Sequence, residues 1–138
     1  MRVMAIDYGD AHTGIAISDP TGLLAGTTDV IHSRRPEVVA AEVARLVQLH
    51  QVEELVMGFP RNMDGTDGAR ADLYRAFAAQ VAQTTGLTPV FWDERRTTIE
   101  AHDILLAAGR RRKNHRQVDA VAASLILEGY LTRKKQGG

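Results

Sequence analysis

The order of its apolar segments constrains the fold of this chain most. Three short apolar stretches at residues 2–8, 13–18 and 23–31 come before the first helical pattern. Closely spaced strands pair as antiparallel neighbours, whereas strands joined by helices pair in parallel. The order therefore predicts an α/β fold, with a five-stranded mixed sheet flanked by helices and a meander of its first three strands. The other predicted elements are strands at 54–59 and 87–92 and helices at 36–50, 69–85, 97–108 and 115–131.

Capping residues set the expected ends of these helices. Pro36 suits the first turn of a helix, because its missing N–H has no partner there. Gly86 suits the position just beyond a helix C-terminus, where glycine tolerates a left-handed backbone. Thr97 and Glu100 form a capping box, in which each side chain bonds a free N–H of the first turn.

The length suits one domain spanning residues 1–138, with a short tail from about residue 133. Without cysteine, disulfides and thiolate zinc sites are excluded. The N-terminus lacks a signal-peptide pattern, and no apolar run approaches the ~18–20 residues of a membrane span. We therefore expect a cytoplasmic protein without membrane contact.

The formal net charge of zero conceals two regions of opposite charge. Residues 1–94 hold 7 basic and 13 acidic side chains, and residues 95–138 hold 10 and 4. Such asymmetry between halves is one indication of contact with nucleic acid. The zero total itself excludes a polybasic tail protein and an acidic disordered chain.

Asp7 is the first candidate for chemistry, because it ends an otherwise apolar strand. In open α/β sheets, sites gather at the carboxyl ends of strands. A carboxylate buried there is costly unless it is paired or binds a metal. The alternative is that Asp7 only caps the turn that follows it.

Two further acidic positions are candidates, at the end of the last strand and near the start of the last helix. Asp93 and Glu94 are consecutive, so in an extended strand they point to opposite faces and one of them can face the same edge as Asp7. Asp119 shares a helical face with Ala122, Ala123, Ile126 and Tyr130. The alternatives are a solvated strand end and a helix stabilised by an acid in its first turns.

Carboxylates on three elements, without a histidine cluster, favour a hard divalent cation. Oxygen ligands suit Mg²⁺ or Mn²⁺. Two such ions can activate a water molecule and stabilise the leaving oxygen of a phosphodiester. We therefore expect a metal-dependent reaction on a phosphodiester.

Basic residues close to these acids favour a nucleic-acid substrate. They are clustered between residues 95 and 116, and Arg61 lies in the loop that follows strand 54–59. Clustered basic side chains neutralise a phosphate backbone, although a solvated loop is the alternative for residues 110–113. The candidate contacts are Arg61, Arg95, Arg110, Arg111, Arg112 and Lys113. Trp92 and Phe91 are expected in the core rather than as stacking platforms.

Four segments together resemble the YqgF/RuvX family of pre-16S rRNA nucleases and Holliday junction resolvase-like proteins. They are Asp7-Tyr-Gly9 through Gly14, Gly58-Phe-Pro-Arg-Asn-Met-Asp-Gly-Thr66, Asp93-Glu-Arg-Arg-Thr-Thr98 and Val118-Asp-Ala-Val-Ala-Ala123. The resemblance extends from Met1 to about Leu131.

The resemblance implies a ribonuclease H-like fold and metal-dependent phosphodiester cleavage. It implies processing of the 5′ end of precursor 16S rRNA in ribosome biogenesis. It carries the family's acidic positions onto Asp7, Asp119 and the Asp93–Glu94 pair, with Glu94 ahead of Asp93 as a metal ligand. His12 departs from the basic residue that the family usually has there, and a neutral imidazole holds phosphate less well than a guanidinium.

Other functions stay open from the sequence. They are cleavage of branched or single-stranded DNA such as a Holliday junction, RNA binding without cleavage in ribosome assembly, and nucleotide binding as in actin-like ATPases. The last is disfavoured, because those proteins close two such domains over the nucleotide and 138 residues supply one. A homodimer is plausible, because two-fold assemblies are the commonest.

Overall fold

The computed structural model describes residues 1–22, 25–59, 68–93 and 115–135. Within these ranges it contains five strands and three helices. They are β1 (Arg2–Asp7), β2 (His12–Ser18), β3 (Ala25–His32), α1 (Pro36–His50), β4 (Val52–Phe59), α2 (Gly68–Thr85), β5 (Val90–Asp93) and α4 (His115–Lys135). The predicted helix at 97–108 lies outside the described residues.

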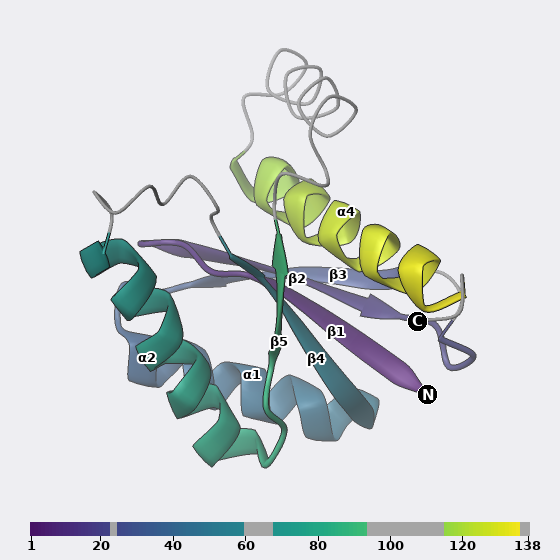
Figure 1. Ribbon diagram of the computed structural model, residues 1–138, viewed down its shortest axis with the longest axis horizontal. Helices are drawn as coiled ribbons and strands as arrows, with labels where there is room; N and C mark the ends of the chain where they lie inside the picture. Colours follow the sequence, from purple (N-terminus) through teal and green to yellow (C-terminus); the bar gives the residue numbers. More distant parts are fainter. Residues whose placement is uncertain (23–24, 60–67, 94–114, 136–138) are drawn as a thin grey trace.

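The strands form one mixed sheet in the order β3-β2-β1-β4-β5 (Figure 1). β1, β2 and β3 are antiparallel neighbours, as the predicted meander requires. β4 is parallel to β1, and β5 is parallel to β4. The predicted five-stranded mixed sheet is confirmed, and the carboxyl ends of β1, β4 and β5 lie along the same edge of it.

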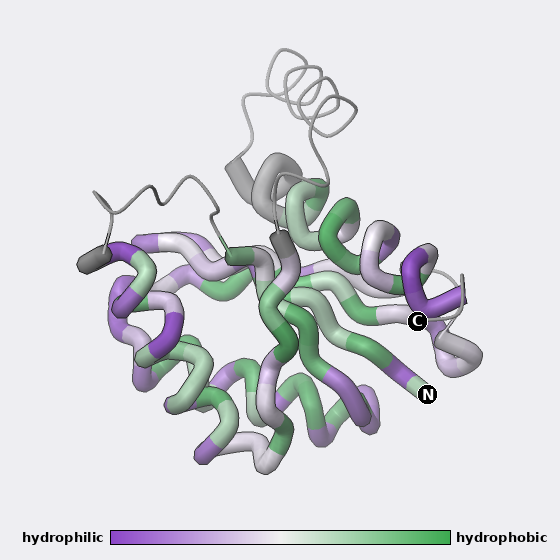
Figure 2. The backbone as a smooth tube through the Cα atoms, in the orientation of Figure 1, coloured by the Kyte–Doolittle hydropathy of each residue, from purple (hydrophilic) through white to green (hydrophobic). Residues whose placement is uncertain are grey.

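Helices cover both faces of the sheet, α1 and α2 on one and α4 on the other (Figure 1). Alternation along β1 divides its side chains between two cores. Met4 and Ile6 pack with α1 and α2, whereas Val3 and Ala5 pack with α4. The central strands are accordingly apolar along most of their length (Figure 2).

On the described residues, most predicted boundaries agree with the structure within one residue, and three differ by two residues or more. α1 begins at Pro36 as predicted. β4 begins at Val52, two residues early, because Val52 pairs with Arg2 at the start of β1. β5 begins only at Val90, since pairing with Val56 starts there. α4 continues to Lys135, so the tail predicted from residue 133 is helical over its first residues.

The two aromatic residues of β5 have different environments. Trp92 is buried against α4, which confirms the prediction that it belongs to the core. The same prediction is wrong for Phe91, whose side chain is 41% exposed. Adjacent residues of a strand face opposite sides of the sheet, so burial of Trp92 does not extend to Phe91.

Among the described helices, none combines the length and the apolar composition that a membrane-spanning helix needs.

Candidate functional site

Asp7 is the last residue of β1 and lies half-buried at the carboxyl edge of the sheet. It pairs with Gly14 of β2. Because Val3 and Ala5 face α4, alternation places Asp7 on the same side of the sheet. The Asp7 carboxylate therefore lies at the carboxyl edge of the sheet, on the face that α4 covers.

Aromatic contacts with α2 fix the backbone that follows Asp7. The Tyr74 hydroxyl donates a hydrogen bond of 2.9 Å to the Tyr8 carbonyl oxygen. The Tyr8 ring stacks on Phe77, with 4.0 Å between centroids and 9° between planes. Burial raises the pKa of the Tyr8 phenol, and the negative charges of Asp10 and Glu37 raise it further. Tyr8 is therefore a neutral anchor at neutral pH, and Asp7 extends from a rigid strand end.

The turn after Tyr8 requires a glycine. A Cβ atom on Gly9 would collide with the carbonyl oxygen of His12. The Gly9 N–H also lies 3.5 Å from Oγ1 of Thr13, which is fully buried. The chain thus returns tightly into β2 directly after Asp7 and Tyr8.

The second acidic position lies along the same edge of the sheet. Asp93 ends β5 and pairs with Phe59, the last residue of β4. Ile6 pairs with Met57 two residues earlier in β4, so the ends of all three parallel strands align within a few residues. The backbone therefore brings position 93 to the edge that carries Asp7.

Asp119 lies in the second turn of α4, and the direction of this helix decides where that turn lies. Contacts with Glu54, near the start of β4, hold the last turns of α4 at the opposite end of the sheet. The first turns of α4 consequently point toward the carboxyl ends of β1 and β4 (Figure 1). The helix brings position 119 to the same end of the molecule as Asp7.

Two residues of α4 hold Glu54, a contact that the sequence did not reveal. The Tyr130 hydroxyl donates a hydrogen bond to Glu54 Oε2, and Lys134 Nζ lies 2.7 Å from Oε1. Burial opposes ionisation of Glu54, but the bonds from Lys134 and Tyr130 outweigh it and lower the pKa of the carboxyl. The signals available in the sequence were an acid at the start of an apolar strand and a Tyr–Lys pair four residues apart on a helix.

Glu54→Gln is expected to lower the free energy of unfolding at pH 7 by about 1 kcal/mol, because it loses charge-assisted bonds to Lys134 and Tyr130. The folded pKa of Glu54 is lowered from 4.5, so its stabilising contribution is present above that pH and is lost as the pH falls through the folded value. Chemical denaturation at pH 7 and near pH 3 measures the effect. An equal difference between the two proteins at both pH values would contradict it.

The buried stripe of α4 is rotated slightly from the predicted face. Ala123 and Ile126 are buried as predicted, but Leu127 and Leu131 complete the stripe. Ala122 and Tyr130 are only half-buried. Asp119 precedes Ala123 by four residues and Leu127 by eight, so the position remains aligned with the buried stripe.

Several predicted site residues lie outside the described residues, and their placement stays a prediction. The side chains of Asp93 and Asp119 also lie outside the described part of the structure, although their backbone is described. The residues concerned are Glu94, Arg61, Arg95, Arg110, Arg111, Arg112 and Lys113. Where side chains are described, no three His, Asp or Glu residues lie together as a metal site.

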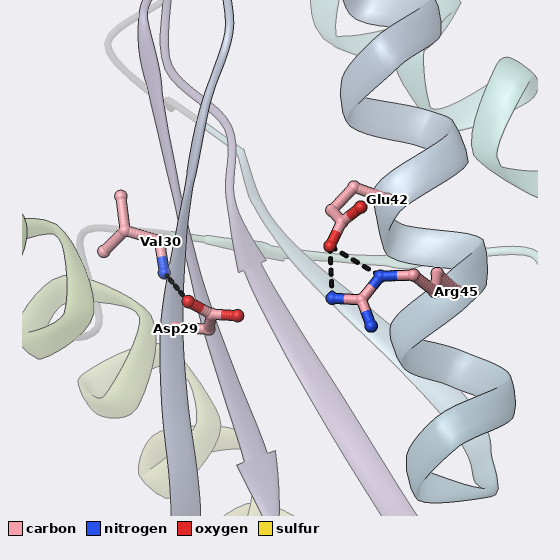
Figure 3. Close-up of polar contacts among 4 residues, drawn as sticks. All are labelled: Asp29, Val30, Glu42 and Arg45. Carbon is pink, nitrogen blue, oxygen red and sulfur yellow. Dashed lines mark hydrogen bonds and ion pairs between the residues drawn. The ribbon is translucent and has the colours of Figure 1, made fainter.

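Several acids of the first 94 residues have local partners. Glu42 accepts hydrogen bonds from the Arg45 guanidinium within α1, and Asp29 accepts a bond of 2.8 Å from the Val30 N–H in β3 (Figure 3). Glu37 accepts a bond of 2.9 Å from Arg35. Part of the acid in this half is therefore engaged in local contacts, and Asp7 is distinguished by its place rather than by its charge.

Comparison with known proteins identifies the family. The model of the RuvX family, described as Holliday junction resolvase, matches residues 1–133. The chain belongs to the RuvX family. The match includes Asp7, Asp93, Glu94 and Asp119, so all four acidic positions lie inside the shared domain.

Curated RuvX relatives share the full length of the chain. A protein of Carboxydothermus hydrogenoformans is 43% identical over 137 residues, which is 99% of each chain. One of Moorella thermoacetica is 45% identical over 139 residues, covering 100% of this chain and 99% of the relative. Both carry the name "Putative pre-16S rRNA nuclease".

Solved structures confirm the ribonuclease H-like fold predicted for this RuvX chain. Thermus thermophilus RuvC bound to a Holliday junction substrate superposes with a TM-score of 0.67 at 13% identity, covering 98% of this chain and 96% of RuvC. The fowlpox virus resolvase bound to Holliday junction DNA gives a TM-score of 0.58 at 12% identity, covering 97% and 99%. At these identities the likeness concerns the fold.

Proposed function

We propose that this chain is a single-domain, metal-dependent nuclease that cleaves phosphodiester bonds. The observation that carries the proposal is the convergence of Asp7, the end of β5 and the first turns of α4 at one end of the sheet. Acidic residues occupy all three places in the sequence. Membership of the RuvX family supports the same reading.

The donor set fits Mg²⁺ or Mn²⁺. Asp7 is a half-buried carboxylate, and the chain contains no cysteine that would favour a softer metal. We propose Asp7, Glu94 and Asp119 as the ligands. Glu94 ranks ahead of Asp93 on the resemblance of Asp93-Glu-Arg-Arg-Thr-Thr98 to the family's motif, and the family match includes both positions. When bound, such ions supply Lewis-acid stabilisation of the charge that develops on the phosphodiester oxygens.

The remaining roles belong to basic side chains. Arg95 follows the Asp93–Glu94 pair, and the 110–113 segment precedes α4. We propose that these residues and Arg61 bind the phosphates on either side of the scissile bond. Guanidinium groups suit that role, because they present planar pairs of donors and stay charged at every physiological pH.

The proposed substrate is the 5′ end of precursor 16S rRNA. The names of full-length relatives at 43% and 45% identity support it. With that substrate, we propose that the protein acts in the cytoplasm. The second candidate is cleavage of branched DNA, which the family description and the likeness to RuvC favour.

One experiment separates these candidates. The purified protein is incubated with a precursor 16S rRNA fragment, single-stranded DNA or a four-way DNA junction, in Mg²⁺, Mn²⁺ or EDTA. We expect metal-dependent cleavage of the RNA ahead of both DNA substrates. Preferential cutting of the junction would assign the chain to DNA. Binding of RNA without cleavage in either metal would instead identify the chain as an RNA-binding assembly factor.

A further inference from the structure

An exposed aromatic side chain lies beside the edge that carries the candidate site. Phe91 is 41% exposed although it lies in a strand of the sheet. It pairs with Met57, which is buried in the core under α1 and α2, so Phe91 faces the α2 side. The Phe59 ring lies 4.8 Å from it, centroid to centroid, at an angle of 59°.

A cation from α2 lies over the Phe59 ring of this aromatic pair. The Arg75 guanidinium lies 5.3 Å from the Phe59 ring centroid, and its side chain is largely exposed. Its ion pair with Asp72 is 3.5 Å long and exposed at both ends, and such pairs are weak. Arg75 can therefore exchange that contact for a phosphate at little cost. We call Phe59, Phe91 and Arg75 the aromatic ledge.

The ledge lies on the α2 face of the sheet, at the end of the parallel strands that carries the candidate site, because Phe59 pairs with Asp93 there. A polynucleotide that extends beyond the candidate site could therefore contact the ledge with a neighbouring segment. An exposed ring beside a guanidinium is the arrangement by which proteins bind single strands, with a base stacked on the ring and a phosphate near the cation. Bases inside a duplex are stacked already and offer no free face.

We propose that the aromatic ledge binds a single-stranded segment of the substrate, with one base stacked on Phe91 and a neighbouring phosphate near Arg75. This inference rests on the proposed nuclease function and adds to it a preference for substrates with an unpaired end. It assigns a contact outside the matched acidic and basic positions. Since stacking tolerates every base, it predicts little sequence preference at that nucleotide.

The test measures binding by fluorescence anisotropy in EDTA, so that no cleavage occurs. The probes are a labelled single-stranded RNA, the same RNA as a blunt duplex, and single-stranded DNA of the same sequence. Phe91→Ala is expected to weaken single-strand binding at least about fivefold and to leave duplex binding unchanged. Phe91→Tyr keeps a ring and should restore the affinity, whereas Phe91→Leu keeps apolar volume and should not.

Two further variants complete the design. Leu73→Ala removes an apolar side chain of α2 that is 61% exposed, and we expect single-strand binding to be unchanged. Arg75→Gln should lower the slope of log affinity against log salt by about 0.7 on single strands. Circular dichroism of each variant verifies the fold.

The outcomes separate this inference from the proposed function. Cleavage by the unaltered protein with equal single-strand affinity in Phe91→Ala would overturn the ledge and leave the nuclease intact. Affinity that depends on the Phe91 ring without any cleavage would support the ledge and overturn the nuclease. No binding to single strands by the unaltered protein would overturn the ledge, and exposure of Phe91 would then point to a protein partner.

Discussion

Replacing Asp7 by Asn is expected to abolish metal-dependent cleavage while the protein stays folded. The amide has the size of the carboxylate but no charge, so it holds a divalent cation poorly. Metal stabilisation of a phosphodiester transition state contributes several kcal/mol, so we expect kcat/KM to fall at least about a thousandfold. Initial rates in Mn²⁺ on the preferred substrate measure the loss.

Asp10→Asn is the matched control for this change. Asp10 is an exposed acid in the turn after β1, only three residues from Asp7, and it belongs to no proposed ligand set. Its variant should keep the activity of the unaltered protein. Equal activity in Asp7→Asn and Asp10→Asn, with both folded by circular dichroism, would refute the carboxylate mechanism.

Phe77→Ala is expected to have the largest effect on stability. Phe77 is 1% exposed and lies among the core residues between α2 and the sheet. Truncating a buried phenylalanine costs about 3–5 kcal/mol, a large part of the roughly 5–15 kcal/mol that holds a domain together. A thermal melt should therefore shift downward by roughly 10–20 °C.

The same substitution removes the ring on which Tyr8 stacks, so residual activity below the melting temperature should fall as well. Leu73→Ala, on the exposed side of the same helix, is the control and should change stability by less than about 0.5 kcal/mol. A Phe77→Ala protein as stable as Leu73→Ala would contradict the described packing of α2.

Local sequence signals predicted much of the fold. Where a predicted strand boundary was wrong, the pairing of that strand with its neighbour explains the difference. Pro36 marks the start of α1, because a proline is tolerated at a first turn and at few other places in a helix. The start of β5 could not be read locally, since Leu87 and Val90 are both apolar and only pairing with Val56 selects the latter. The exposure of Phe91 depends in the same way on which helix covers that end of the sheet.

The candidate site divides along similar lines. The place of Asp7 at the end of β1 could be predicted, because an acid at the end of an apolar strand is conspicuous in the sequence. The meeting of its strand with β5 and α4 depends on the order β1-β4-β5, whereas the alternation of strands and helices implied parallel strands without their order. The bonds of Glu54 with Tyr130 and Lys134 could not be predicted, since they join residues about 80 positions apart. The assignment of Glu94 over Asp93 remains a prediction.

The antiparallel course of α4 over β1 has a practical consequence. It places Met1 and the last turn of α4 at one end of the sheet and the candidate site at the other (Figure 1). A fluorophore or an affinity handle on the amino group of Met1 would therefore stand about the length of β1 away from a bound polynucleotide. Single-molecule or surface-immobilised measurements of cleavage can use that attachment point without obstructing the strand under study.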